Sequence, residues 1–182
     1  HIFADQIICL DHPWYHKGFI QDQVKRIPRW VVLINRKIFL EKASKFKCSK
    51  KIFLDRSSSS FNHCQIFNQK HVNKWVKKND LDIYQPEKIS FKKQIYLFKK
   101  ASVILGAHGA AFTNIIFCRP GTKIIEIIPA NHPNRKCERI SKILKLKYFR
   151  IVTKPDNSNK NFPFRIHLEK KHFKMIDEAI NL

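Results

Sequence analysis

The chain has 182 residues, enough for one domain with a sizeable core, and it carries a formal net charge of +22. No apolar run approaches the length of a membrane span, which excludes a predicted membrane-spanning helix. The first residue is His1 rather than Met and no signal peptide precedes it, so we expect a fragment whose compartment cannot be taken from targeting signals.

The positive charge favours polyanions, including nucleic acid, anionic membrane surfaces and phosphorylated ligands. The lysines, however, are spread through every segment without regular interleaving with aromatic residues, and no nucleic-acid-binding motif accompanies them. The chain is also rich in Lys, Ile, Asn and Phe, a bias expected of an AT-rich genome. We favour solvated lysine-rich faces over a polyanion-binding surface. We therefore expect no specific nucleic-acid partner, and we keep open a peripheral contact with an anionic membrane.

The cysteines do not indicate a metal or disulfide framework. They are odd in number, widely separated and without a C-x-x-C pair: Cys9, Cys48, Cys64, Cys118 and Cys137. Reduced thiols in a cytosolic protein are the simpler interpretation, and we expect no metal site.

Hydrophobic periodicity predicts alternating helices and strands. Residues 1–18 are expected to form an irregular lead-in, 57–60 a loop and 154–160 a polar linker. The predicted helices run from Pro28 through Phe39, from an Asn68 cap past Val76, from a Ser90 cap past Phe98, over 110–117, over 136–145, and to a last helix ending near Leu182. The predicted strands are 52–54, 81–84, 103–105, 123–128, 148–152 and a short one after the linker. This alternation predicts an α/β fold, a Rossmann-like parallel sheet with helices on both faces and with Leu105 in its most central strand.

Three of the four glycines lie in one segment, as Gly106, Gly109 and Gly121. The first two form a turn between a buried strand and a helix. Such a turn concentrates unpaired N–H groups and about half a positive charge, a natural seat for phosphate. A tight turn without a ligand remains the alternative, because the dinucleotide-binding pattern G-x-G-x-x-G is absent.

The glycine segment and its neighbours together resemble the C-terminal half of glycosyltransferase family 61. The matching residues are Lys51-Ile-Phe-Leu-Asp-Arg56, Asn68-Gln69, Ser90-Phe91 with Gln94, Gly106-Ala-His-Gly-Ala110, Thr113-Asn114, and Pro120-Gly121-Thr122 with Glu126 and Pro129. The family includes bacterial capsular-polysaccharide transferases, plant xylosyl- and arabinosyltransferases and eukaryotic O-GlcNAc transferases of the secretory pathway. The segment Ile27-Pro28-Arg29-Trp30 is similar to the bacterial members. The chain departs from the family at one place. Members of the family commonly have an arginine near an Asn-Glu pair, whereas this chain has Gln65 and Asn68-Gln69 there. If that arginine helps to hold the donor, this chain is expected to bind the donor more weakly.

The resemblance implies a GT-B glycosyltransferase with two Rossmann-like halves that transfers a sugar with inversion. This chain is then the nucleotide-sugar half, with residues 1–48 as a lead-in segment and connecting helix and 49–182 as the donor-binding domain. The N-terminal half of the enzyme would be missing. The expected donor is a UDP-sugar, the acceptor a glycan or other hydroxyl, and no cofactor is needed. The compartment would be the bacterial cytoplasm or the cytoplasmic membrane face for a bacterial protein, and the secretory-pathway lumen for a eukaryotic one.

The candidate donor-binding residues lie after predicted strands, whose carboxyl ends meet at one edge of a parallel sheet. Arg56 would pair with the pyrophosphate, His108 would donate to phosphate or sugar, and the amides of Gly109 and Ala110 would hold phosphate. Asn114 would orient the donor or the loop, and Glu126 would accept from ribose hydroxyls. Each has a structural alternative: a surface charge, a core residue, a turn hydrogen bond or a buried ion pair. The catalytic base is not identified. Two further functions stay open, a non-catalytic polyanion-binding domain and an inactive truncated relic.

Overall fold

The computed structural model describes residues 27–58, 64–132, 134–154 and 164–182. The predicted lead-in at 1–18, half of the loop at 57–60 and most of the linker at 154–160 lie outside the described residues. No helix in the described part is both long and apolar enough to cross a membrane.

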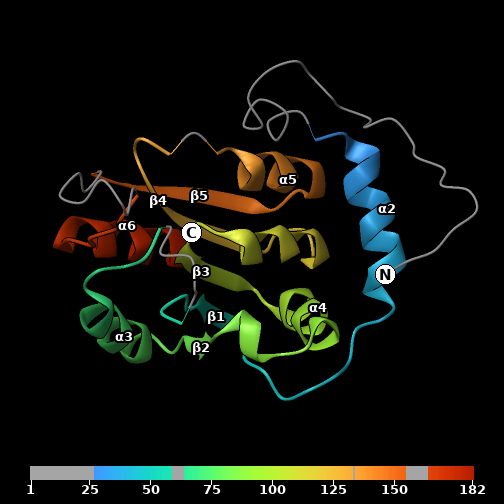
Figure 1. Ribbon diagram of the computed structural model, residues 1–182, viewed down its shortest axis with the longest axis horizontal. Helices are drawn as coiled ribbons and strands as arrows, with labels where there is room; N and C mark the ends of the chain where they lie inside the picture. The colour runs from blue at the N-terminus through green and yellow to red at the C-terminus, as the bar shows by residue number, and fades with distance from the viewer. Residues whose placement is uncertain (1–26, 59–63, 133, 155–163) are drawn as a thin grey trace, which may run out of the picture.

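The centre of the molecule is a five-stranded sheet in the order β2-β1-β3-β4-β5, in which every neighbouring pair is parallel (Figure 1). The strands are β1 (Lys51–Leu54), β2 (Asp82–Tyr84), β3 (Val103–Ala107), β4 (Lys123–Pro129) and β5 (Lys147–Thr153). The prediction of a parallel α/β sheet is confirmed. So is the central position of the strand that contains Leu105.

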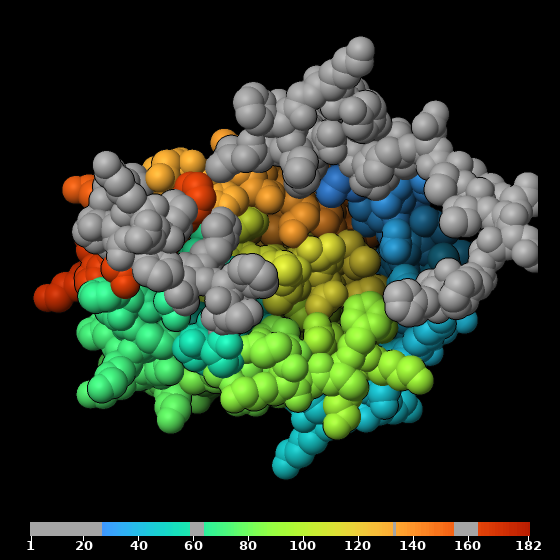
Figure 2. Space-filling model, viewed as in Figure 1, coloured from blue at the N-terminus to red at the C-terminus, as the bar shows by residue number. Residues whose placement is uncertain are grey.

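Helices cover both faces of the sheet. They are α2 (Arg29–Leu40), α3 (Gln69–Lys78), α4 (Phe91–Lys100), α5 (Lys136–Leu144) and α6 (Lys170–Asn181), with the short 3₁₀ helix η1 (Pro86–Lys88) and the longer 3₁₀ helix η2 (Ala110–Phe117). One core cluster joins α2, α4, α5 and η2 to the sheet, and the other joins α3 and α6. On the face seen in Figure 2, the surface of η2 lies between those of α4 and α5.

The central strand explains how one sequence fills two cores. Along β3, Ile104 packs into the α2–α4–α5 cluster, whereas Val103 and Leu105 pack into the α3–α6 cluster. Successive side chains of a strand point to opposite faces, so a strand covered on both sides must be apolar at every position. All five residues of β3 are buried.

The segment after the glycine turn is a 3₁₀ helix. The sequence predicted a helix over residues 110–117, and these bounds are confirmed, but it did not predict that the helix would be 3₁₀ rather than α. Phe112 donates its N–H to Gly109 and Cys118 donates to Ile115, both with the i to i−3 spacing. In a 3₁₀ helix, side chains three residues apart stack in one row. Phe112, Ile115 and Cys118 form such a row and are all buried, so the tighter helix places every third residue in the core.

Three local predictions need correction. Asn68 stands at the N-cap position of α3 but makes no capping bond. Its amide instead donates to the Leu168 carbonyl at 2.8 Å and accepts from the Leu168 N–H at 3.1 Å. Ser90 likewise precedes α4 without a side-chain cap. The strand predicted after the linker is represented, in the part of the chain that the structure describes, by an isolated parallel bridge between Ile66 and Ile166.

Candidate functional site

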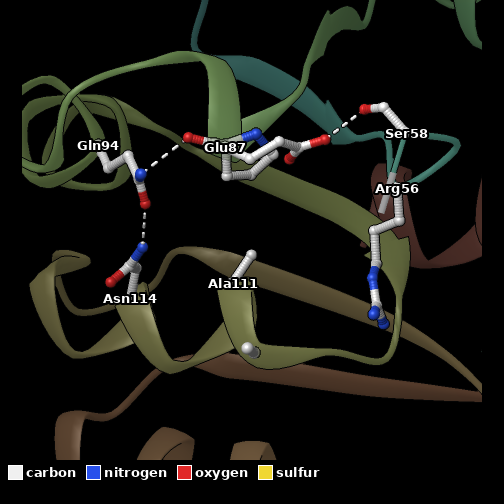
Figure 3. Close-up of a pocket in the computed structure, with 8 residues that line it drawn as sticks. Arg56, Ser58, Glu87, Gln94, Ala111 and Asn114 are labelled. Atoms are coloured by element: carbon white, nitrogen blue, oxygen red, sulfur yellow. Dashed lines mark hydrogen bonds between the residues drawn. The ribbon is translucent and has the colours of Figure 1, made fainter. Parts of the chain in front are cut away.

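A pocket of about 470 Å³ lies where the chain leaves the carboxyl ends of β1, β2 and β3 (Figure 3). Its lining comes from the loop after β1, from η1 and α4, and from η2: Arg56, Ser58, Pro86, Glu87, Gln94, Ala110, Ala111 and Asn114. The volume is in the range of small-ligand sites, and the carboxyl edge of a parallel sheet is where such sites form.

Arg56 forms the cationic wall of this pocket. The half-buried side chain follows β1 and donates from Nη1 to the carbonyl oxygen of His108, at the end of β3. In Figure 3 the guanidinium lies beside the loop that leads into η2. Burial lowers the pKa of Arg56 from its ordinary value, but a guanidinium remains charged in proteins. The pocket therefore joins a fixed positive charge to the N-terminus of η2.

Gln94 and Asn114 form a second wall. Gln94, on α4, donates from Nε2 to the carbonyl oxygens of Pro86 at 2.8 Å and Ile89 at 3.1 Å. Its Oε1 accepts from Asn114 Nδ2 on η2 at 2.8 Å, as Figure 3 shows. The Asn114 amide is thus held in one orientation by a side chain that is itself anchored on backbone carbonyls.

Glu87 brings a carboxylate to the same pocket. Its Oε1 accepts a hydrogen bond from the Ser58 hydroxyl, which joins η1 to the loop after β1 (Figure 3). An ionised carboxylate offers only acceptors, so Glu87 suits the hydroxyl groups of a ligand rather than its phosphates. The sequence analysis did not identify Glu87 as a candidate site residue. The feature that could have indicated it is its position shortly after the strand predicted at 81–84, at the edge of the sheet where ligands bind.

Glu126 and His108 form a buried pair beneath the pocket rather than part of its lining. The Nδ1 atom of His108 lies 2.5 Å from Oε1 of Glu126, and the two residues are 4% and 1% exposed. Tyr148 donates from its hydroxyl to Oε2 at 2.6 Å, and the Cys137 thiol donates to Oε1 at 3.0 Å. The ring of His108 also packs against that of His132, with 4.4 Å between centroids.

The electrostatics of Glu126 depend on these partners. Burial alone would raise the pKa of a carboxyl group. It is outweighed by the hydrogen bond and charge of His108 and by the hydrogen bonds from Tyr148 and Cys137, so the pKa of Glu126 is lowered. The same burial and the adjacent carboxylate raise the pKa of the Tyr148 hydroxyl and of the Cys137 thiol. Glu126 is an ionised group whose oxygens are engaged by protein donors.

His108, Glu126 and Cys137 are also the group of described residues whose side chains could hold a metal ion, with ligand atoms within 4.8 Å of one another. The fit to a metal is poor. A thiol binds metal as the thiolate, and burial next to Glu126 raises the pKa of Cys137 well above its ordinary value. These atoms already form hydrogen bonds with one another, which accounts for the cluster without an ion.

The structure brings the six candidate residues together at one end of the sheet, in two layers. Arg56, Ala110 and Asn114 line the pocket. Gly109 lies directly under the Arg56 guanidinium, and His108 and Glu126 are buried below. The described residues of the loop after β4 (130–132, 134 and 135) are not among those that line the pocket.

Comparison with known proteins connects this geometry to a family. The sequence model described as Glycosyltransferase 61 matches residues 2–125, which contain β1, β2, β3 and the whole pocket lining. Beta-1,2-xylosyltransferase of Arabidopsis thaliana is 42% identical over 60 residues, which are 33% of this chain and 11% of that protein. Beta-1,2-xylosyltransferase RCN11 of Oryza sativa subsp. japonica is 35% identical over 63 residues, 35% of this chain and 12% of that protein.

A third relative, Xylan glycosyltransferase MUCI21 of Arabidopsis thaliana, is 35% identical over 51 residues, 28% of this chain and 10% of that protein. These three relatives are plant proteins and give no support to the bacterial capsular-polysaccharide type. The matched regions span about a tenth of each relative's length. Since the family model covers more than half of the chain and the fold has the expected parallel sheet, the chain belongs to glycosyltransferase family 61.

Proposed function

We propose that this chain is the donor-binding part of an inverting glycosyltransferase that transfers a sugar from a nucleotide-sugar donor to a hydroxyl of a glycan. The observation that carries the proposal is the pocket in which Arg56 and the start of η2 meet at the carboxyl edge of the sheet. Family membership supports it independently.

The diphosphate of the donor would lie against Arg56 and the amides of Gly109 and Ala110. The first N–H groups of a helix have no partner within it, and a guanidinium pairs with phosphate through two parallel hydrogen bonds. Both groups are held before the ligand arrives: Arg56 by the His108 carbonyl and η2 by its buried row of side chains. Charge that develops on the leaving nucleotide is stabilised most by such preorganised donors, and this requires no metal ion and no cofactor.

The other candidates have distinct parts in this proposal. Asn114, held by Gln94, would contact the donor or its sugar. His108 and Glu126 would act from below, by fixing the loop that carries Gly109. A ribose contact by Glu126 would require its carboxylate to leave three protein donors. The catalytic base and the acceptor site would come from a second Rossmann-like domain, as the GT-B resemblance implies.

The names of the relatives guide the finer proposal. Since two of them are named beta-1,2-xylosyltransferases and the third a xylan glycosyltransferase, we propose a UDP-pentose donor and a polysaccharide or other glycan acceptor. We also propose that the protein is of the eukaryotic type and acts in the lumen of the secretory pathway. A fluorescent fusion of the complete protein, followed in plant cells, tests the compartment.

The test of donor binding is calorimetric titration of the chain with UDP and UDP-xylose. Arg56→Ala should weaken UDP binding by about tenfold to a hundredfold, because a charge-assisted hydrogen bond to phosphate is lost. Arg119→Ala, which removes an exposed arginine outside the pocket lining, is the matched control and should bind UDP like the wild type.

The alternative of a polyanion-binding domain rests on the net charge of +22. It predicts binding of single-stranded nucleic acid with a steep salt dependence that Arg56→Ala does not change. If the wild-type chain binds nucleic acid in this way and does not bind UDP, the donor-binding proposal is wrong.

A further inference from the structure

Asp55, the residue before Arg56, is the hub of a polar network that no sequence pattern indicated. Its side chain is buried, at 4% exposure, and its carboxylate accepts hydrogen bonds from the loop after β1, from the residue that follows β2 and from the first residue of α3. The donors are Ser57 N at 2.9 Å and Gln69 Nε2 at 3.3 Å to Oδ1, and Ser57 Oγ at 2.8 Å and Gln85 Nε2 at 2.8 Å to Oδ2.

The network fixes the backbone on either side of Arg56. A carboxylate that accepts from the N–H two residues later closes an Asx turn, and here the turn spans Asp55, Arg56 and Ser57. The Asp55 N–H donates to the Tyr84 carbonyl at 2.9 Å, which continues the β1–β2 pairing up to the turn. The position from which the Arg56 side chain leaves the backbone is therefore determined on both sides.

The two glutamines connect this turn to the rest of the site. Gln85 lies between β2 and η1, next to Pro86 in the pocket lining, and also donates to Ser57 Oγ at 3.3 Å. Gln69 is the first residue of α3. Asp55 thus joins the segments that follow β1 and β2 to the start of a helix on the other face of the sheet.

We propose that Asp55 is a positioning residue of the donor site and that it acts through Arg56. Its carboxylate holds the turn from which Arg56 reaches the pocket, so that the guanidinium is in place before the diphosphate binds. The inference rests on the proposed donor-binding function and assigns within it a residue that does not touch the ligand.

Asp55→Asn tests the chemistry at constant size. An amide replaces one acceptor oxygen with an N–H₂ donor, which then faces either the Ser57 and Gln69 donors or the Ser57 and Gln85 donors. We expect UDP affinity per folded molecule to fall by about tenfold, as for the loss of a buried charge-assisted contact. Asp82→Asn makes the same change of charge at the exposed first residue of β2 and should leave UDP affinity unchanged.

A double-mutant cycle separates positioning from general stability. If Asp55 acts through Arg56, then Asp55→Asn should cause no further loss of UDP affinity in an Arg56→Ala background. If Asp55 has a purely structural role, Asp55→Asn should lower the melting temperature in both backgrounds. Its loss of UDP affinity should then add to the loss caused by Arg56→Ala.

Exchanging the carboxylate and the amide between Asp55 and Gln85 gives a second test, in a variant that keeps the native net charge. In the pair Asp55→Asn with Gln85→Glu, the new amide donates to the new carboxylate, and the Ser57 hydroxyl can rotate to accept instead of donate. We expect this pair to recover most of the UDP affinity lost in Asp55→Asn. If Asp55→Asn alone does not fold, Gln85→Ala, which removes one donor and keeps the carboxylate, should still weaken UDP binding several-fold relative to Asp82→Asn.

The outcomes distinguish the two proposals. UDP binding that requires Arg56 but is unchanged by Asp55→Asn and by Gln85→Ala overturns the role of Asp55 and leaves the donor site standing. Additive losses in the cycle, or an exchange variant that folds without recovering affinity, also overturn it. Absence of UDP binding by the wild-type chain overturns the proposed function itself.

Discussion

The guanidinium of Arg56 occupies the space that a side chain on Gly109 would fill. The backbone of Gly109, with φ of 174°, is extended and open to any residue, so the conformation of the loop does not require glycine there. What requires glycine is the close approach of Arg56, which passes over the loop to reach the His108 carbonyl.

Gly109→Ala should therefore separate binding from stability. The new methyl group would displace the end of a long, flexible side chain, and Arg56 can swing toward solvent at little cost to the fold. We expect UDP affinity to fall by about tenfold and the melting temperature to change by no more than about 2 °C. Calorimetry and thermal melts on one preparation measure both.

Gly121→Ala is the matched control for that substitution. Gly121 has φ of +81° and open space around its Cα, so alanine there meets backbone strain and no steric overlap. It should cost about 1 kcal/mol of stability and leave UDP affinity unchanged. Equal UDP affinities for Gly109→Ala and the wild type would show that Arg56 does not contribute from its present position.

Glu126→Gln should change how stability depends on pH. The pKa of Glu126 is lowered in the folded state, so its contribution is present above the unfolded value of about 4.3 and is lost as the pH falls through the folded pKa. We expect the wild type to lose stability more steeply than Glu126→Gln below about pH 4.5, with the variant about 2 kcal/mol less stable at pH 7. Thermal melts from neutral to acidic pH measure the difference, and two parallel curves would contradict it.

His108→Ala should affect both the core and the loop. It removes a partner of the buried Glu126 carboxylate and the anchor of the segment that leads to Gly109, so we expect a lower melting temperature and about tenfold weaker UDP binding per folded molecule. Tyr148→Phe removes another donor to Glu126 from β5 and leaves the loop untouched. It should lower the melting temperature and keep UDP affinity. If His108→Ala also keeps UDP affinity, then His108 is a structural residue only.

UDP binding should not depend on a divalent cation. Among the residues that the structure describes, the pocket lining holds one carboxylate and one guanidinium. Arg56 with the start of η2 supplies the positive charge that a metal would otherwise bring. Titrations with EDTA and with added Mn²⁺ or Mg²⁺ should give the same affinity within about twofold. Loss of binding on chelation would contradict the prediction.

The order of helices and strands follows from local properties of the sequence. Val103, Ile104 and Leu105 form a strand covered on both faces because apolar residues stand at consecutive positions, and this places β3 at the centre of the sheet. Arg56 and Ala110 were expected to lie close together because residues that follow parallel strands meet at one edge of the sheet, and both line the candidate pocket. These inferences need only the periodicity of the chain and the geometry of parallel strands.

What the sequence could not determine are the partners of each polar side chain. Asp55 meets Gln85 across 30 positions, Asn114 meets Gln94 across 20, and Glu126 reaches its donors across as many as 22. Asn68 illustrates the same limit, since its amide pairs with Leu168, 100 positions away, instead of capping its own helix. A buried hydrogen-bonding group must find a partner, but the packing of the layers decides which one is near. For that reason the sequence could predict which edge of the sheet carries the candidate pocket, whereas the division between pocket lining and buried support was decided only by the tertiary structure.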